Sequence, residues 1–158
     1  MNPPKSPIEK HKQAKIMSRD KRSDFLIEMN DHVMHAGKRN NKEFSKIKAV
    51  AKSPAKLAAF TKIPVDSITK VFKSTDLKTT YSQFQEAVGN EYTKFHNWIT
   101  QAKNKARGVQ RYDDAYNFEV NLEVKISKER EALQTRIKQL TTVLVQAIKR
   151  IIKKEESK

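Results

Sequence analysis

The chain has 158 residues, and its 33 Lys and Arg residues against 18 Asp and Glu residues give a net charge of +15. So large an excess of positive charge favours a polyanionic partner, whether DNA, RNA or an anionic surface. The absence of Cys excludes disulfides, thiolate zinc sites and Cys nucleophiles, and no apolar run approaches the roughly 20 residues of a membrane span. We therefore expect a cytoplasmic protein with one domain, or one small domain with extensions.

Few residues have the arrangement that catalysis or metal binding needs. The chain has only three Gly residues, which argues against phosphate-cradling loops and against sheets rich in tight turns. The acidic residues form no obvious pair, and the Ser residues lack the Gly context of a nucleophile. His32 and His35 lie one turn apart, but no Cys/His cluster elsewhere would complete a metal site. We expect no catalytic residues, no cofactor and no metal.

Residues 1–22 are basic and contain three Pro before position 8. This composition predicts a flexible arm. The arm would lie along phosphates or enter a minor groove, or it would be only a solubilising tail.

A helical DNA-binding unit is expected over residues 23–75, with a basic trihelical helix-turn-helix arrangement of short helices. Ser23 or Asp24 would cap the first helix, and Gly37 would end it. After a basic link, a helix over residues 41–53 has apolar residues on one face and leads into the stretch Ser53–Ser74.

The stretch Ser53–Ser74 predicts two helices joined by a tight turn. Ser53 can cap the first helix, and Pro54 fits its first position because no hydrogen bond is lost there. Pro64 can restart the chain as a second helix, whose Ile68 and Val71 recur at helical spacing. This pattern predicts a helix-turn-helix at residues 54–73, and a helical hairpin inside a bundle would show the same spacing.

Residues 57–72, LAAFTKIPVDSITKVF, resemble the helix-turn-helix of lactose-repressor-type bacterial regulators position by position. The resemblance implies a DNA-docking fold. Lys62 stands where that family usually has Gly, and a left-handed Lys costs roughly 1 kcal/mol more than Gly. Val65 and Asp66 stand where the family usually offers polar groups to bases, and Asp accepts hydrogen bonds only from cytosine. The resemblance therefore supports docking more than sequence readout.

The charge is concentrated in the same part of the chain. Residues 35–75 contain ten basic residues against two acidic ones, a net charge of +8. The Lys residues of this stretch are candidates for phosphate contacts, and Lys70 could also reach guanine. The expected DNA-binding residues are Lys56, Lys62, Val65, Asp66, Thr69, Lys70 and Lys73.

Residues 76–158 predict a long two-helix, coiled-coil-like hairpin. Its first helix would end at Gly108 and has a stripe at steps of three and four, formed by Tyr81, Phe84, Val88, Tyr92, Phe95, Ile99, Ala102 and Ala106. The spacing favours packing, although aromatics interleaved with Lys can also stack unpaired bases. A second helix is expected over residues 114–154, with 116–126 readable as a strand. The apolar face of residues 81–151 would serve an antiparallel return or a homodimer.

We therefore expect an all-α, non-enzymatic protein that docks a basic helix-turn-helix on duplex DNA, as a regulator, a nucleoid protein or a plasmid or phage accessory factor. The alternative is a helical adaptor whose positive charge meets an acidic protein, RNA or an anionic membrane surface.

Overall fold

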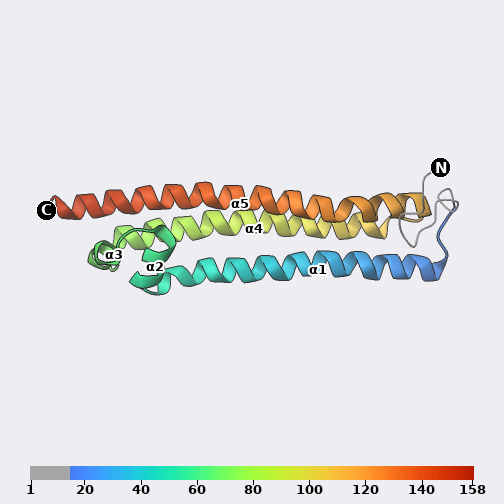
Figure 1. Cartoon of the computed structure of the whole chain (residues 1–158), viewed down its shortest axis with the longest axis horizontal. Helices are drawn as coiled ribbons and strands as arrows, with labels where there is room; N and C mark the ends of the chain where they lie inside the picture. Colours follow the sequence, from blue (N-terminus) through green and yellow to red (C-terminus); the bar gives the residue numbers. More distant parts are fainter. Residues whose placement is uncertain (1–14) are drawn as a thin grey trace. The chain divides into compact units, whose positions relative to one another are not determined.

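The computed structural model describes residues 15–158, and all regular secondary structure in that range is helical (Figure 1). The elements are α1 (Arg19–Ala49), the short 3-10 helix η2 (Val50–Lys52), α2 (Pro54–Thr61), α3 (Val65–Val71), α4 (Thr75–Arg107) and α5 (Tyr112–Glu156). The predicted all-α class is confirmed. Most of the predicted basic arm, residues 1–14, lies outside the described residues, but Arg19–Arg22 are helical and not part of a flexible arm.

The residues group into two compact units. The described part of unit 1 comprises residues 15–39 and Phe95–Glu131, and unit 2 comprises Asn40–Lys94 and Ala132–Lys158. The helices α1, α4 and α5 contribute to both units, whereas α2 and α3 belong to unit 2 alone.

The prediction that Gly37 ends a helix is wrong, because α1 continues through it to Ala49. A Gly inside a helix costs about 1 kcal/mol relative to Ala. Here that cost is outweighed by a buried face that includes Met29, Val33 and Ala36 and that fixes α1 up to the residue before Gly37. The expected basic link after Gly37 is also helical, and its Asn40, one turn after Ala36, is buried.

Unit 1 joins the first part of α1 to the turn between α4 and α5. The Phe25 and Phe118 rings meet edge to face with centroids 5.9 Å apart. The Arg22 guanidinium donates hydrogen bonds to the carbonyls of Arg107 and Val109 at the end of α4. Such bonds satisfy carbonyls that have no partner within the helix, and they fix the start of α1 at this turn.

Residues 116–126 are helical, as predicted, and not a strand. Leu122 and Ile126 are buried one turn apart, whereas Val120 and Val124 are about half exposed. This segment therefore follows the period of four that is typical of a helix. The sequence appears to alternate like a strand because exposed Val residues occupy positions that usually hold polar residues.

Unit 2 is organised around the aromatic residues of α4. The Tyr81 hydroxyl donates a 2.6 Å hydrogen bond to the carbonyl of Ile47 at the end of α1, and burial raises the pKa of Tyr81 to about 12. The Phe84 ring lies 6.0 Å from that of Phe60 in α2. The aromatic stripe of α4 is thus a packing surface, as its spacing predicts.

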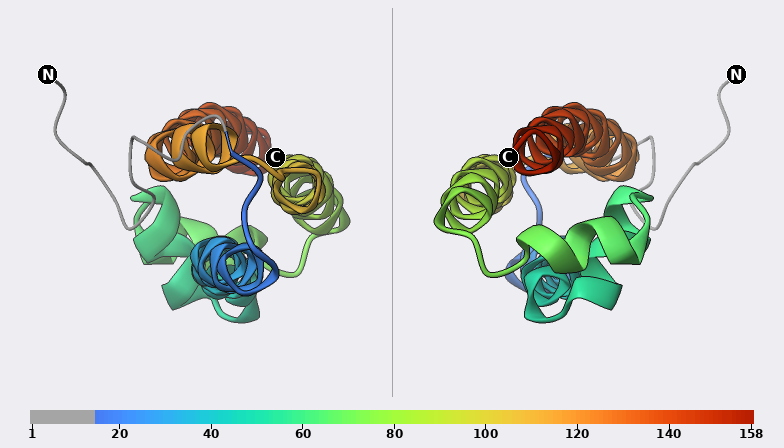
Figure 2. Two further views of the ribbon diagram at one scale, coloured as in Figure 1. Left: turned by 90° about the vertical axis from the view of Figure 1, so that its right-hand side faces the viewer. Right: turned by 90° about the vertical axis from the view of Figure 1, so that its left-hand side faces the viewer.

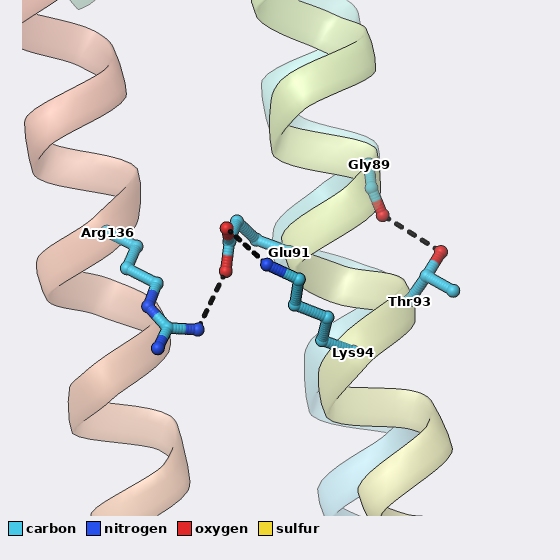
Figure 3. Close-up of polar contacts among 5 residues, drawn as sticks. All are labelled: Gly89, Glu91, Thr93, Lys94 and Arg136. Carbon is cyan, nitrogen blue, oxygen red and sulfur yellow. Dashed lines mark hydrogen bonds and ion pairs between the residues drawn. The ribbon is translucent and has the colours of Figure 1, made fainter.

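An ion pair links α4 to α5 within unit 2 (Figure 3). Glu91 accepts hydrogen bonds from Arg136 at 3.0 Å and from Lys94 at 3.3 Å. The Glu91 side chain is only 16% exposed. Burial raises the pKa of Glu91, but the hydrogen bonds from Arg136 and Lys94 outweigh burial and hold its pKa below the ordinary value.

Replacing Gly37 by Ala should raise the free energy of unfolding by roughly 0.5–1 kcal/mol, because Gly37 is helical and an added Cβ would meet no atom within 4 Å. Urea denaturation measures the change. A destabilised variant would show that Gly37 ends α1 in a conformation that Ala does not accept.

The Glu91 ion pair should stabilise the fold only when the carboxyl is ionised. Because the folded pKa is lowered, its contribution, about 1 kcal/mol, should be full above the unfolded pKa of roughly 4.3 and be lost as the pH falls through the folded value. Urea denaturation of wild type and Glu91→Gln should differ at pH 7 and converge near pH 3. The exposed Glu86→Gln is the control, and an equal difference at both pH values contradicts this account.

Candidate nucleic-acid interface

The helix α2 begins where the sequence predicts. Ser53 has extended backbone angles, and its Oγ accepts a 3.2 Å hydrogen bond from the backbone N–H of Lys56. Pro54 follows at the first helical position. Ser53 is therefore a true N-cap, and it satisfies one of the N–H groups that the helix leaves without a partner.

The turn after α2 depends on Lys62. Its backbone is left-handed, with φ 60° and ψ 24°, and its N–H donates a 2.8 Å hydrogen bond to the carbonyl of Ala58. Lys62 is the only non-Gly residue with positive φ among residues 15–158. Thr61 supports the turn from inside, since its buried hydroxyl donates to the carbonyl of Leu57 at 2.7 Å. The strain expected for a Lys at this position is present.

Buried apolar side chains hold α2 and α3 together across the turn. Leu57 comes from α2, Ile63 from the turn, and Ile68 and Val71 from α3, and each is at most 5% exposed. With Pro64 at its N-terminal boundary, α3 exposes four of its residues to solvent, namely Val65, Asp66, Thr69 and Lys70. The two helices and their turn thus form a packed pair with one free face.

All seven predicted contact residues have exposed side chains. They are Lys56 in α2, Lys62 in the turn, Val65, Asp66, Thr69 and Lys70 in α3, and Lys73 two residues after the end of α3. The Thr69 hydroxyl donates to the carbonyl of Val65 at 2.8 Å, so its oxygen can act toward an outside partner mainly as an acceptor. The first turn of α3 exposes Val65 and Asp66, which offer little to bases or phosphates.

Two further cations stand beside the turn, and sequence reasoning did not place them there. Lys149 and Lys153 of α5 line a groove of about 490 Å³ together with Lys62, Pro64 and Ser67. The right-hand view of Figure 2 faces this end of unit 2, where α3 and the last turns of α5 come toward the viewer. The basic pattern near the C-terminus signalled these residues, but nothing in it indicated that they lie next to the turn.

Charge distinguishes unit 2 from the rest of the chain. It contains 17 Lys and Arg residues against 7 Asp and Glu residues, which is +10 of the total +15. Arg150 and Lys154 lie on a neighbouring groove beside Thr79 and Thr80. A positive surface of this kind raises the local concentration of a polyanion and speeds its association.

His32 and His35 have different surroundings. His32 Nδ1 lies 3.0 Å from a carboxylate oxygen of Glu123, and His35 is exposed. Within the part of the chain that the structure describes, no group of His, Asp and Glu residues could hold a metal ion. Over the same residues, no helix has the length and apolar composition of a bilayer span.

Comparison of the chain with protein-family models, curated proteins and solved structures found no match. The resemblance of residues 57–72 to lactose-repressor-type regulators therefore stays a prediction that rests on those residues alone.

Position 62 allows backbone strain and charge to be separated. Lys62→Gly and Lys62→Ala both remove the cation, but only Gly relieves the left-handed strain. The Gly variant should therefore be more stable than the Ala variant by about 1 kcal/mol, whereas the two variants should not differ in any binding to a polyanion that depends on the Lys62 charge. Urea denaturation and a binding assay on the same two samples check this. Equal stability would mean that the turn is not left-handed in solution.

Proposed function

We propose that this chain is a non-enzymatic protein that docks the α2–α3 pair of unit 2 on duplex DNA. The observation that best supports the proposal is that two features occur together at the turn between α2 and α3. All seven predicted contact residues are exposed on or beside α2 and α3, and Lys149 and Lys153 of α5 add positive charge at the same turn. A protein that acts on DNA in this way would work at the nucleoid.

Phosphate contacts would supply most of the affinity. Each Lys that neutralises a phosphate releases condensed counterion, so the binding constant falls by roughly the 0.9 power of the salt concentration for each contact on duplex DNA. Lys56, Lys62, Lys70 and Lys73 would contact one stretch of backbone, and the α5 cations would extend that contact.

Sequence readout would be weak. The short helix α3 exposes Val65 and Asp66 in its first turn, and neither pairs well with most base edges. Lys70 is the exposed residue of α3 best suited to a guanine contact. We therefore propose docking with modest specificity.

The proposal does not require a homodimer. The apolar stripe over residues 81–151, which we expected to pair two copies, contributes Tyr81, Val88, Leu144 and Ile148 to the core of the single chain, where each is at most 4% exposed. Because one chain already buries these residues, we propose that each chain docks by itself.

A second candidate is a helical adaptor for another macromolecule, as the charge alone would allow. The observation that supports this candidate is that α5 exposes Val120 and Val124 one turn apart. Docking on DNA does not use these apolar side chains. Binding of RNA, an acidic protein or anionic vesicles in preference to duplex DNA would favour this candidate.

Retardation assays with the full chain and a DNA duplex test the first proposal. Lys70→Ala with Lys73→Ala, and separately Lys149→Ala with Lys153→Ala, should weaken binding without unfolding the protein. Each pair should make the negative slope of log K against log salt shallower by about 1.8, the value for two lost contacts. The double variant Lys38→Ala with Lys128→Ala, which removes two exposed cations of unit 1, should change the slope far less. Absence of duplex binding at ~50 mM salt rules the proposal out.

A further inference from the structure

A pocket of about 280 Å³ lies between α4 and α5 within unit 1, and none of the residues assigned to DNA docking lines it. Trp98 of α4 and Phe118 of α5 line it with partly exposed rings, and the buried side chains of Ala102 and Leu122 also line it. The lining thus combines two aromatic side chains with polar and charged groups, which suits a flat aromatic ligand with polar edges. The volume is just below the roughly 300 Å³ at which drug-sized pockets begin, so the ligand would be small or only partly enclosed.

Both rings are supported by other aromatic residues of unit 1. The Phe118 ring meets Phe25 of α1 edge to face at 5.9 Å, and the Trp98 ring lies 6.0 Å from that of Phe95. Phe25 and Phe95 are buried. The two pocket rings are therefore held in place before a ligand arrives, which lowers the entropy lost on binding.

The rim of the pocket supplies hydrogen-bonding groups and positive charge. The amides of Gln101, Asn117 and Asn121 can each donate and accept, as the edges of nucleobases require. The Asn121 amide also donates a 2.8 Å hydrogen bond to the carbonyl of Asn117, which holds that side chain against α5. Asn and Gln side chains are common partners of base edges because they match both donors and acceptors.

The pocket lining contains two exposed ammonium groups and one carboxylate. Lys105 and Lys125 line the pocket together with Asp114. Of the ion pairs among residues 15–158, none involves either Lys. The lining is therefore net positive and favours an anionic ligand, while the Asp114 carboxylate can accept a hydrogen bond from a base N–H.

We propose that this pocket binds a nucleotide, with the base against Trp98 and the phosphate at Lys105 and Lys125. The nucleotide is either free or an unpaired residue of a single strand, because both present the same base face and phosphate. A base inside a duplex is stacked on both sides and paired, so it cannot enter. The site is thus separate from the duplex-docking surface of unit 2 and does not depend on it.

Trp98 is the only Trp of the chain, so its fluorescence reports on this pocket directly. We would titrate the full-length protein with adenosine monophosphate, with single-stranded oligodeoxyadenylate of about five nucleotides, a length typical of a small binding site, and with a DNA duplex. Stacking of a base on Trp98 should quench its fluorescence in a saturable way, and the duplex should quench it far less than the single strand.

Substitutions connect the signal to the pocket. Lys105→Ala with Lys125→Ala should weaken binding by about fivefold or more, the effect of losing roughly 1 kcal/mol of phosphate hydrogen bonding. The exposed Lys128→Ala on the same helix should leave binding unchanged. Circular dichroism of each variant confirms that α4 and α5 remain folded.

Each outcome decides the proposal. Saturable quenching by the monophosphate identifies a free nucleotide as the ligand, and quenching by the oligonucleotide alone identifies an unpaired residue of a strand. No quenching by either ligand overturns the proposal, as does quenching that the Lys105→Ala and Lys125→Ala pair leaves unchanged.

Discussion

The apolar stripe of α4 is the surface on which both units depend. In unit 2 its aromatic residues contact α1 and α2, through the hydrogen bond from Tyr81 to the Ile47 carbonyl and through the Phe60–Phe84 ring contact. In unit 1 the same stripe continues as Phe95 and Ile99, which are buried. The chain has only 37% apolar residues, and arranging them as one stripe along a helix lets so lean a composition bury a core in each unit.

This arrangement determines that the charged side chains lie on the surface. Because the apolar side chains face inward along the helices, the Lys residues of unit 2 remain on its surface, and α2 and α3 present theirs around a left-handed turn. Lys62 combines both roles there. Its backbone strain costs about 1 kcal/mol, while its ammonium group joins Lys149 and Lys153 at the groove beside the turn. A Gly would relieve the strain but would leave the groove with one cation fewer.

Local signals predicted local structure well. The Ser53 cap, the turn at Lys62 and the end of α4 before Gly108 all follow from residues next to each other in the sequence. The prediction at Gly37 was wrong because a Gly ends a helix only when packing of the flanking residues does not favour continuation of the helix. The buried face of α1 extends to Ala36, directly before Gly37. Contacts between residues distant in sequence could not be predicted from the sequence. No periodicity indicated that Lys153 lies beside the α2–α3 turn, or that Trp98 and Phe118 line one pocket.

The central claim is that unit 2 meets duplex DNA through α2, α3 and the adjacent part of α5. Titration of the ¹⁵N-labelled protein with a short duplex, followed by NMR of the backbone amides, tests it most directly. The account predicts shifts concentrated at residues 56–73 and 149–154, which diminish as salt is raised. Shifts confined to unit 1, or uniform small shifts at every exposed Lys, would contradict it.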